Sequence, residues 1–154
     1  MSTEDIRNFV RVDDRIITGG QPTEAQLRSA AGEGVQVVIN LATFDPRSSL
    51  DDEAGLVRSL GLEYHHVPVV WEKPTESDFE MFSSWLKQAG GKKVLIHCAA
   101  NYRVTAFFSL YAMQNLKWSE AQADELMALI WQRGKYPIWD EFISRMKQKI
   151  TGGE

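Results

Sequence analysis

The sequence has a single cysteine, no excess of positive charge and no long apolar run. One thiol excludes an internal disulfide framework and a zinc site of four thiolates. Seventeen basic residues stand against 21 acidic ones, whereas nucleic-acid binders usually carry a basic excess. The apolar runs fall well short of the roughly 20 residues of a membrane span, and the first residues lack the basic-then-apolar order of a signal peptide. We therefore expect a cytoplasmic protein that binds neither nucleic acid nor membrane.

The size and composition are those of an ordinary globular chain. It has 154 residues, of which 44% are hydrophobic and 25% charged, and these values exclude disordered and fibrous proteins. No internal repeat, low-complexity tract or linker divides it. We expect residues 1–154 to form a single domain, and the sequence does not indicate an oligomeric state.

Apolar runs that predict strands alternate with patterns that predict helices. The predicted strands are Arg15–Thr18, Val35–Leu41, Glu63–Val70 and Val94–His97. Helices are predicted from Thr23 to the Gly32–Gly34 stretch, over about Leu50–Leu60, from Pro74 to Gly90, over about Arg103–Asn115, from Ser119 to Gly134, and over Trp139–Ile150. The alternation predicts an α/β fold with three layers: a mainly parallel sheet of four to five strands with helices on both faces.

Cys98 comes directly after the predicted buried strand Val94–His97. Ligands of such sheets bind beyond the carboxyl ends of the central strands, where a loop leads into a helix. The residues from Cys98 to Arg103, here called the signature loop, are a tight loop of mostly small residues that enters a helix. Backbone N–H groups there, together with the helix dipole, favour an anion and stabilise a thiolate. This arrangement predicts a nucleophilic cysteine rather than a buried filler residue.

The segment His97-Cys98 with Arg103 and Thr105 resembles the signature of cysteine-dependent tyrosine and dual-specificity phosphatases. The stretches Ile17–Pro22 and Gly34–Leu41 are also similar to that superfamily, and more narrowly to a small bacterial group, the beta-lactamase-hydrolase-like phosphatase-like domain. The similarity covers roughly residues 10 to 115. It implies a phosphotyrosine phosphatase II-like fold and a reaction that needs neither metal nor cofactor.

The resemblance also implies roles for individual residues. Cys98 would be the nucleophile that forms a phosphocysteine, and His97 its buried partner. A hydroxyl, that of Thr105, would steady the departing thiolate. The phosphate-binding residues would be Ala99, Ala100, Asn101, Tyr102 and Arg103. The partner would be a phosphorylated small molecule, a phosphoprotein or another oxyanion.

The spacing in this chain departs from the superfamily pattern. Four residues separate Cys98 from Arg103 instead of five, and Val104 intervenes before Thr105. One helical residue corresponds to a rotation of about 100°, so a regular loop cannot aim both Arg103 and Thr105 as in the superfamily. Either the loop is remodelled so that Arg103 reaches the anion, or Val104 occupies the place of the clamp. We favour the remodelled loop.

The general acid of the superfamily is an Asp on an upstream loop, and the corresponding segment Val69–Pro74, here called the acid loop, contains none. Glu72 is the nearest carboxylic acid and is our candidate. Asp78 is the alternative, although its position three residues after Thr75 suits a helix start. Asp45 and Arg47 either line the rim of the site or form a solvated turn.

Three functions remain open from the sequence. The first is a phosphatase that hydrolyses a phosphate monoester through Cys98. The second is a sulfur-transfer enzyme that carries a persulfide on Cys98, because rhodanese-type enzymes also use a short loop. The third is a catalytically impaired pseudophosphatase that binds an anion. A metal site is not expected, because His65 and His66 are adjacent in a strand and point to opposite faces.

Overall fold

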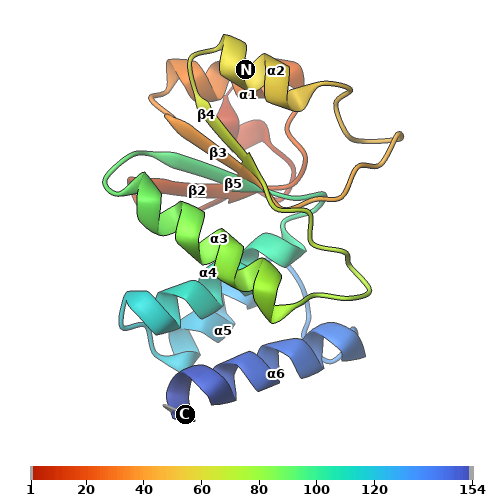
Figure 1. Cartoon of the computed structure of the whole chain (residues 1–154), viewed down its shortest axis with the longest axis vertical. Coiled ribbons are helices and arrows are strands. Elements are labelled where there is room, and N and C mark those ends of the chain that lie inside the picture. Colours follow the sequence, from red (N-terminus) through yellow and green to blue (C-terminus); the bar gives the residue numbers. More distant parts are fainter. Residues whose placement is uncertain (1, 153–154) are drawn as a thin grey trace.

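A computed structural model describes residues 2–152 of the chain (Figure 1). The described residues form an α/β structure with a short 3-10 helix, η1, over Thr3–Asp5. The other elements in chain order are β1 (Val10–Arg11), β2 (Ile16–Gly19), α1 (Glu24–Gly32), β3 (Val37–Asn40), α2 (Glu53–Ser59), β4 (Glu63–His66), α3 (Glu76–Ala89), β5 (Val94–His97), α4 (Tyr102–Asn115), α5 (Glu120–Ala128) and α6 (Pro137–Gly152).

The strands of the described residues form one sheet in the order β1-β2-β5-β3-β4. Neighbouring strands are parallel except β1, which runs antiparallel to β2. The predicted, mainly parallel sheet is therefore confirmed. Because parallel strands share a direction, the carboxyl ends of β2, β5, β3 and β4 meet at one edge. The two-residue strand β1 is too short to give a sequence pattern and was not predicted.

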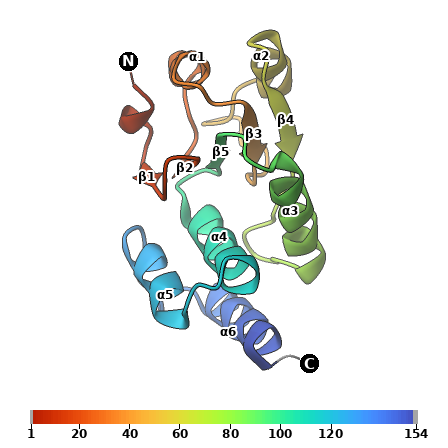
Figure 2. The same cartoon turned by 90° about the vertical axis from the view of Figure 1, so that its left-hand side faces the viewer.

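Side chains that alternate along the strands build two separate cores. Ile17, Val38 and Leu95 face the cluster under η1, α1 and α2. Ile39 and Ile96 face the larger cluster shared with α3, α4, α5 and α6. The helices accordingly lie on opposite faces of the sheet (Figures 1 and 2), which confirms the three-layer fold.

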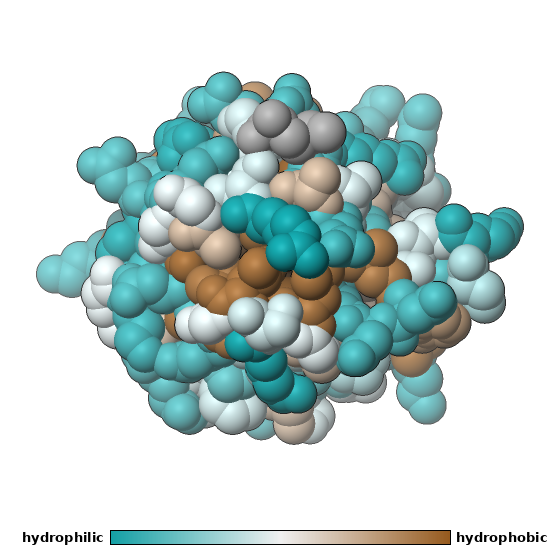
Figure 3. Space-filling model, turned by 90° about the horizontal axis from the view of Figure 1, so that it is seen from above, coloured by the Kyte–Doolittle hydropathy of each residue, from teal (hydrophilic) through white to brown (hydrophobic). Residues whose placement is uncertain are grey.

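The layer of α1 and α2 is the thinner of the two helical layers. Viewed from its side, an apolar area is visible in the middle of the face, surrounded by hydrophilic residues (Figure 3). The cluster below it contains partly buried leucines, among them Leu56 and Leu60. No helix among residues 2–152 combines the length and apolar character needed to cross a bilayer.

The starts of α1, α3 and α5 were predicted well because they carry local signals. Thr23 and Ser119 form capping boxes with the residues three positions later, as their spacing indicates. Thr75 forms the same box with Asp78, whose carboxylate accepts the Thr75 N–H at 3.2 Å. The carboxylate of Asp78 is thus engaged at the start of α3.

Several predicted boundaries were wrong. Helix α2 begins after the cap Asp52 and not at Leu50, and α5 ends at Ala128 rather than Gly134, since the chain there turns into a loop over residues 129–136. Strand β4 ends at His66 and not at Val70. Beyond it the chain stays extended, and the N–H of Val69 donates to the Leu41 carbonyl at 3.0 Å.

Candidate active site

Cys98 lies at the carboxyl edge of the sheet, directly after the central strand β5. Its side chain is buried, with 1% of the residue exposed, and its N–H donates to the Gly19 carbonyl at 3.3 Å. The signature loop then leads into α4 within four residues. The predicted placement of a thiol at a strand end before a helix is therefore what the chain adopts.

The carbonyl groups of the signature loop are held by donors from other segments. The Ala99 oxygen accepts the Gln21 N–H at 3.0 Å, and the Ala100 oxygen accepts Nδ2 of Asn8 at 2.9 Å. Gly20 permits this close approach, because a Cβ there would stand 2.5 Å from the Ala99 oxygen. A backbone atom cannot yield as a flexible side chain can, so this position requires glycine.

Several backbone N–H groups of the same loop stay available. Those of Ala99, Ala100, Tyr102 and Arg103 donate to no acceptor within residues 2–152. The last two belong to the first turn of α4, where the helix dipole adds positive potential. Loop amides combined with a helix N-terminus make a binding place for an oxyanion.

Asn101 makes the short turn between the strand and the helix. Its φ of 70° lies in the left-handed region, which Asn tolerates better than most residues. The residue is fully buried, and its Nδ2 donates to the Asn8 carbonyl at 2.8 Å and to Thr18 Oγ1 at 3.0 Å. This turn lets α4 begin at Tyr102, so a loop one residue shorter than the superfamily pattern still places a helix above Cys98.

Arg103 is buried and bears a positive charge without a carboxylate partner among the described residues. It is 7% exposed, and its Nη1 donates to the Val69 carbonyl at 2.8 Å. Val104, the other candidate for the clamp position, is fully buried in the apolar cluster below the sheet. The side chain that turns toward the acid loop is therefore that of Arg103. A buried guanidinium normally pairs with an anion, because desolvating its charge is costly.

Thr105 does not form a hydrogen bond with Cys98. Its hydroxyl donates to the Asn101 carbonyl at 2.9 Å and accepts Nε1 of Trp131 at 3.1 Å. These contacts fasten the first turn of α4 to the loop that precedes α6. In this structure the hydroxyl thus serves the helix start.

His97, which precedes the nucleophile Cys98, is fully buried, and its side chain contacts both Glu53 and the Cys98 backbone. Its Nε2 lies 2.5 Å from Oε2 of Glu53, and its Nδ1 lies 3.3 Å from the Cys98 oxygen. Gln21 donates to the other Glu53 oxygen at 2.9 Å. Burial by itself raises the pKa of Glu53, but the hydrogen bonds from His97 and Gln21 outweigh burial and lower it. The carboxylate is therefore held in its charged form.

Sequence reasoning missed Glu53. Its one local signal is the position on α2, four residues before the buried Val57, which places both side chains on the inward face of the helix. A buried acid on an inward face needs a partner, and the buried His97 at the end of β5 provides one.

The acid loop differs from the signature loop in how its side chains are held. Glu72 is exposed and forms no hydrogen bond with residues 2–152. The backbone around it is fixed, since the Val69 oxygen accepts from Arg103 and the Trp71 oxygen accepts Nε1 of Trp139 at 2.7 Å. The acid loop thus contacts Arg103 through its backbone, while the carboxylate of Glu72 faces solvent.

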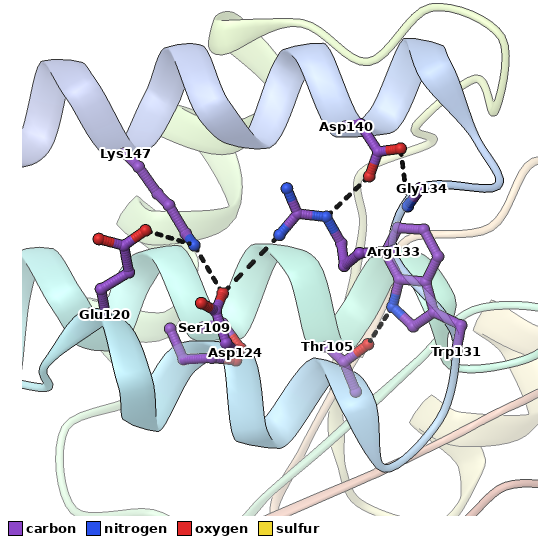
Figure 4. A network of polar contacts seen from close by, with 10 residues as sticks. Thr105, Ser109, Glu120, Asp124, Trp131, Arg133, Gly134, Asp140 and Lys147 are labelled. Carbon is purple, nitrogen blue, oxygen red and sulfur yellow. Dashed lines mark hydrogen bonds and ion pairs between the residues drawn. The ribbon is translucent and has the colours of Figure 1, made fainter.

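Aromatic rings flank the signature loop. Tyr102 stacks on Trp131 with ring centroids 5.3 Å apart, and it also contacts Trp71 and Tyr136. An ionic network that joins α5, α6 and the loop between them stabilises that loop (Figure 4). In it Arg133 pairs with Asp140 and Asp124, and Lys147 pairs with Asp124 and Glu120.

Asp45 and Arg47 pair with each other. Their side chains meet at 3.1 Å, the guanidinium is 90% exposed, and the hydrogen bonds from Arg47 lower the pKa of Asp45. They form a solvated turn and not a wall of the site. His66 Nε2 contacts the Ala42 oxygen and His65 stacks on Trp85. Within the described residues no three His, Cys, Asp or Glu side chains gather as metal ligands would.

Comparison with known proteins decides the family. No family model matches the chain. A crystal structure described as "Putative phosphatase (DUF442)" from Shewanella putrefaciens CN-32 is 32% identical, covers 96% of this chain and 95% of its own, and superposes with a TM-score of 0.87. The chain belongs to the DUF442 family.

The DUF442 assignment agrees with more distant comparisons. A beta-lactamase hydrolase-like protein of Xylella fastidiosa is 30% identical over 124 residues, which are 79% of this chain but only 28% of that protein. The P. aeruginosa protein TpbA, solved in complex with pTyr, is 14% identical and shares the fold with a TM-score of 0.72 over 99% of this chain and 94% of its own. Both resemblances inferred from the sequence, to the cysteine-dependent phosphatases and to the beta-lactamase-hydrolase-like group, are confirmed.

Proposed function

We propose that the protein is a phosphatase that hydrolyses a phosphate monoester through a phosphocysteine on Cys98. The observation that carries the proposal is Arg103, a buried guanidinium with no carboxylate partner in residues 2–152, in a loop where the N–H groups of Ala99, Ala100, Tyr102 and Arg103 have no acceptor among the same residues. Together they supply the positive charge that a dianionic phosphate requires. The kinship with DUF442 phosphatases supports the same class of reaction.

The first half of the reaction transfers the phosphoryl group to sulfur. The Cys98 thiolate attacks phosphorus, so that an S–P bond forms while the bond from phosphorus to the ester oxygen breaks. Glu72 gives a proton to the departing oxygen. The loop amides and Arg103 bind the equatorial oxygens, on which charge is spread in the transition state.

The second half returns the enzyme to its starting state. A water molecule attacks phosphorus, its proton passes to the Glu72 carboxylate, and the S–P bond breaks to release inorganic phosphate and the thiolate. His97 and Glu53 keep the strand end and the loop in place throughout. Because the amides and Arg103 supply the stabilising charge, this route uses no metal and no cofactor.

The experiment that tests this function is hydrolysis of p-nitrophenyl phosphate between pH 5 and 7 by the wild-type protein and by Cys98→Ser. This leaving group departs without protonation, so an exposed acid does not conceal the nucleophile. We expect turnover that vanadate inhibits and that falls at least about 10³-fold in the variant. Asp45→Asn, in the solvated turn, is the surface control and should keep activity within about twofold.

The absence of turnover in a reduced, folded wild-type protein would contradict the proposal. One feature favours a second candidate in that event: the loop counts six residues from Cys98 to Arg103, with Asn101 in the left-handed conformation. A loop of this length suits sulfane-sulfur transfer as in rhodanese-type enzymes. Incubation with thiosulfate followed by mass spectrometry would then reveal a persulfide on Cys98, and its absence would leave anion binding alone.

A further inference from the structure

The segment from Thr3 to Phe9, here called the N-terminal strap, lies against the signature loop although 92 residues separate their contacting positions. Its contacts with the loop come mainly from Asn8. The Asn8 side chain donates through Nδ2 to the Ala100 oxygen at 2.9 Å, and the Asn101 side chain donates in return to the Asn8 oxygen at 2.8 Å. The two amides thus form a reciprocal pair across the strap and the loop.

Both partners adopt an unusual backbone conformation. The φ angles of Asn8 and Asn101 are 53° and 70°, and Lys117 is the one other non-glycine residue with positive φ in residues 2–152. Asn101 is fully buried, yet its Oδ1 has no hydrogen-bond partner there. Backbone strain and an unsatisfied buried oxygen both cost stability, and such costs concentrate at functional sites.

The strap is itself anchored to the body of the protein. The N–H and hydroxyl of Thr3 donate to Glu33 at 3.1 and 2.5 Å, and Gln26 donates to the Asp5 carbonyl at 3.0 Å. Ile6 is 3% exposed in the cluster under α1 and α2. Asn8 therefore contacts the loop from a fixed platform.

We propose that Asn8 is a positioning residue of the anion-binding loop. The peptide bond is planar, so a donor on the Ala100 carbonyl fixes the orientation of the whole peptide between Ala100 and Asn101. Without that donor the peptide can rotate and turn the carbonyl oxygen, with its partial negative charge, toward the bound anion. The strap thereby keeps the inner side of the signature loop lined by donors. The effect of Asn8 on catalysis rests on the proposed function. Its effect on anion binding does not.

Because Asn8 is exposed, its role in positioning the loop can be tested separately from any contribution to the stability of the fold. Its side chain lies at the surface and its bond to Ala100 is solvent-exposed, so it adds little to the free energy of unfolding. Removing the side chain should therefore change the loop and leave global stability nearly unaltered. A residue of the core would show the opposite.

The test uses two variants that lack the donor but tolerate positive φ, Asn8→Gly and Asn8→Asp. Binding of inorganic phosphate and of vanadate is measured by calorimetry, and backbone mobility of the loop by NMR order parameters. We expect binding weakened about three- to tenfold, more for vanadate than for phosphate, and lower order parameters in residues 99–102. The melting temperature should stay close to that of the wild type.

Lys117→Gly is the matched control, because it replaces the third non-glycine residue of positive φ in residues 2–152, at an exposed site in the loop between α4 and α5. It should bind both anions within twofold of the wild type. Asn101→Gly keeps the left-handed conformation, removes the buried half of the amide pair and should weaken binding further than Asn8→Gly.

An anion affinity of Asn8→Gly within twofold of the wild type would overturn the positioning role, because Asn8→Asp also adds a negative charge that repels the anion. The same measurements separate this proposal from the proposed function. A wild-type protein that binds phosphate without hydrolysing esters refutes the phosphatase, while the Asn8 variants still report on the strap. A wild-type protein that binds neither anion overturns both.

Discussion

Two loops at the same edge of the sheet differ in how firmly they are held. In the signature loop after β5, three successive carbonyls have donors from the strap, from the segment that follows β2 or from α4, and Cys98 and Asn101 are buried. In the acid loop after β4, two carbonyls are fixed by Arg103 and Trp139, but the carboxylate of Glu72 faces solvent.

The difference indicates which half of the proposed chemistry is organised in advance. Binding an oxyanion and attacking it need groups held rigidly, because electrostatic stabilisation depends on dipoles that do not reorganise. The proton donor does not have to be positioned before the substrate binds, since catalytic hydrogen bonds often tighten only in the bound complex. We therefore expect a site that handles good leaving groups readily and poor ones through a rearrangement of the acid loop.

Apart from loss of the nucleophile itself, the largest effect should come from Arg103→Lys. Lysine keeps the charge but offers neither two parallel donors nor the bond to Val69, so kcat/KM for p-nitrophenyl phosphate should fall about 10²- to 10³-fold. Arg28→Lys, an exposed change on α1, is the control and should leave kinetics unchanged. A decrease of less than fivefold in Arg103→Lys would mean that the guanidinium does not reach the anion and that the signature loop is less organised than proposed.

A smaller effect is expected for Glu53→Gln, which removes the charge behind the signature loop. The pKa of Glu53 is lowered in the folded protein, so the stability it contributes is present above the ordinary value of 4.5 and is lost as the pH falls through the lowered one. The free energy of unfolding of the variant at pH 7 should be about 1–3 kcal/mol lower than that of the wild type. Denaturant unfolding of both proteins from pH 3 to 7 measures the difference between their free energies of unfolding. That difference should become smaller below pH 4.5. A difference that is independent of pH would contradict the ionised pair.

The smallest effect should be that of Glu72→Gln on an aryl phosphate. Because p-nitrophenolate leaves unprotonated, kcat/KM should change less than about threefold. On an alkyl phosphate such as phosphoserine the same variant should lose about 10²-fold if the acid loop delivers the proton. Glu76→Gln, at the start of α3, serves as the nearby control. Equal losses on both substrates would contradict the role of Glu72 as the proton donor to the leaving group.

The fold was largely predictable because its signals are local. Capping residues such as Thr23 and Thr75 start helices through contacts three positions away, and runs such as Val94–His97 show buried strands directly. Endpoints such as Ala128 were missed because a loop packed by Trp131 and an ionic network replaces the last turns that the pattern suggests.

The site was predictable only where its residues are consecutive. Cys98, Arg103 and the loop between them are consecutive in the sequence, from the end of β5 to the first turn of α4. Glu53 and Asn8 reach the same place from 44 and 92 residues away. Local patterns carry no information on such contacts, because the sheet order and the packing of α2 and the strap create them.

The burial of Cys98 also governs how the protein can be labelled. It is the single thiol of the chain, and because only 1% of the residue is exposed we expect reagents to reach it only where the proposed anion would enter. A small charged alkylating agent such as iodoacetate should enter with the help of the loop amides, whereas a bulky neutral maleimide should be kept out. The carboxymethyl group that iodoacetate adds would then sit on one known atom of the molecule, the Cys98 sulfur.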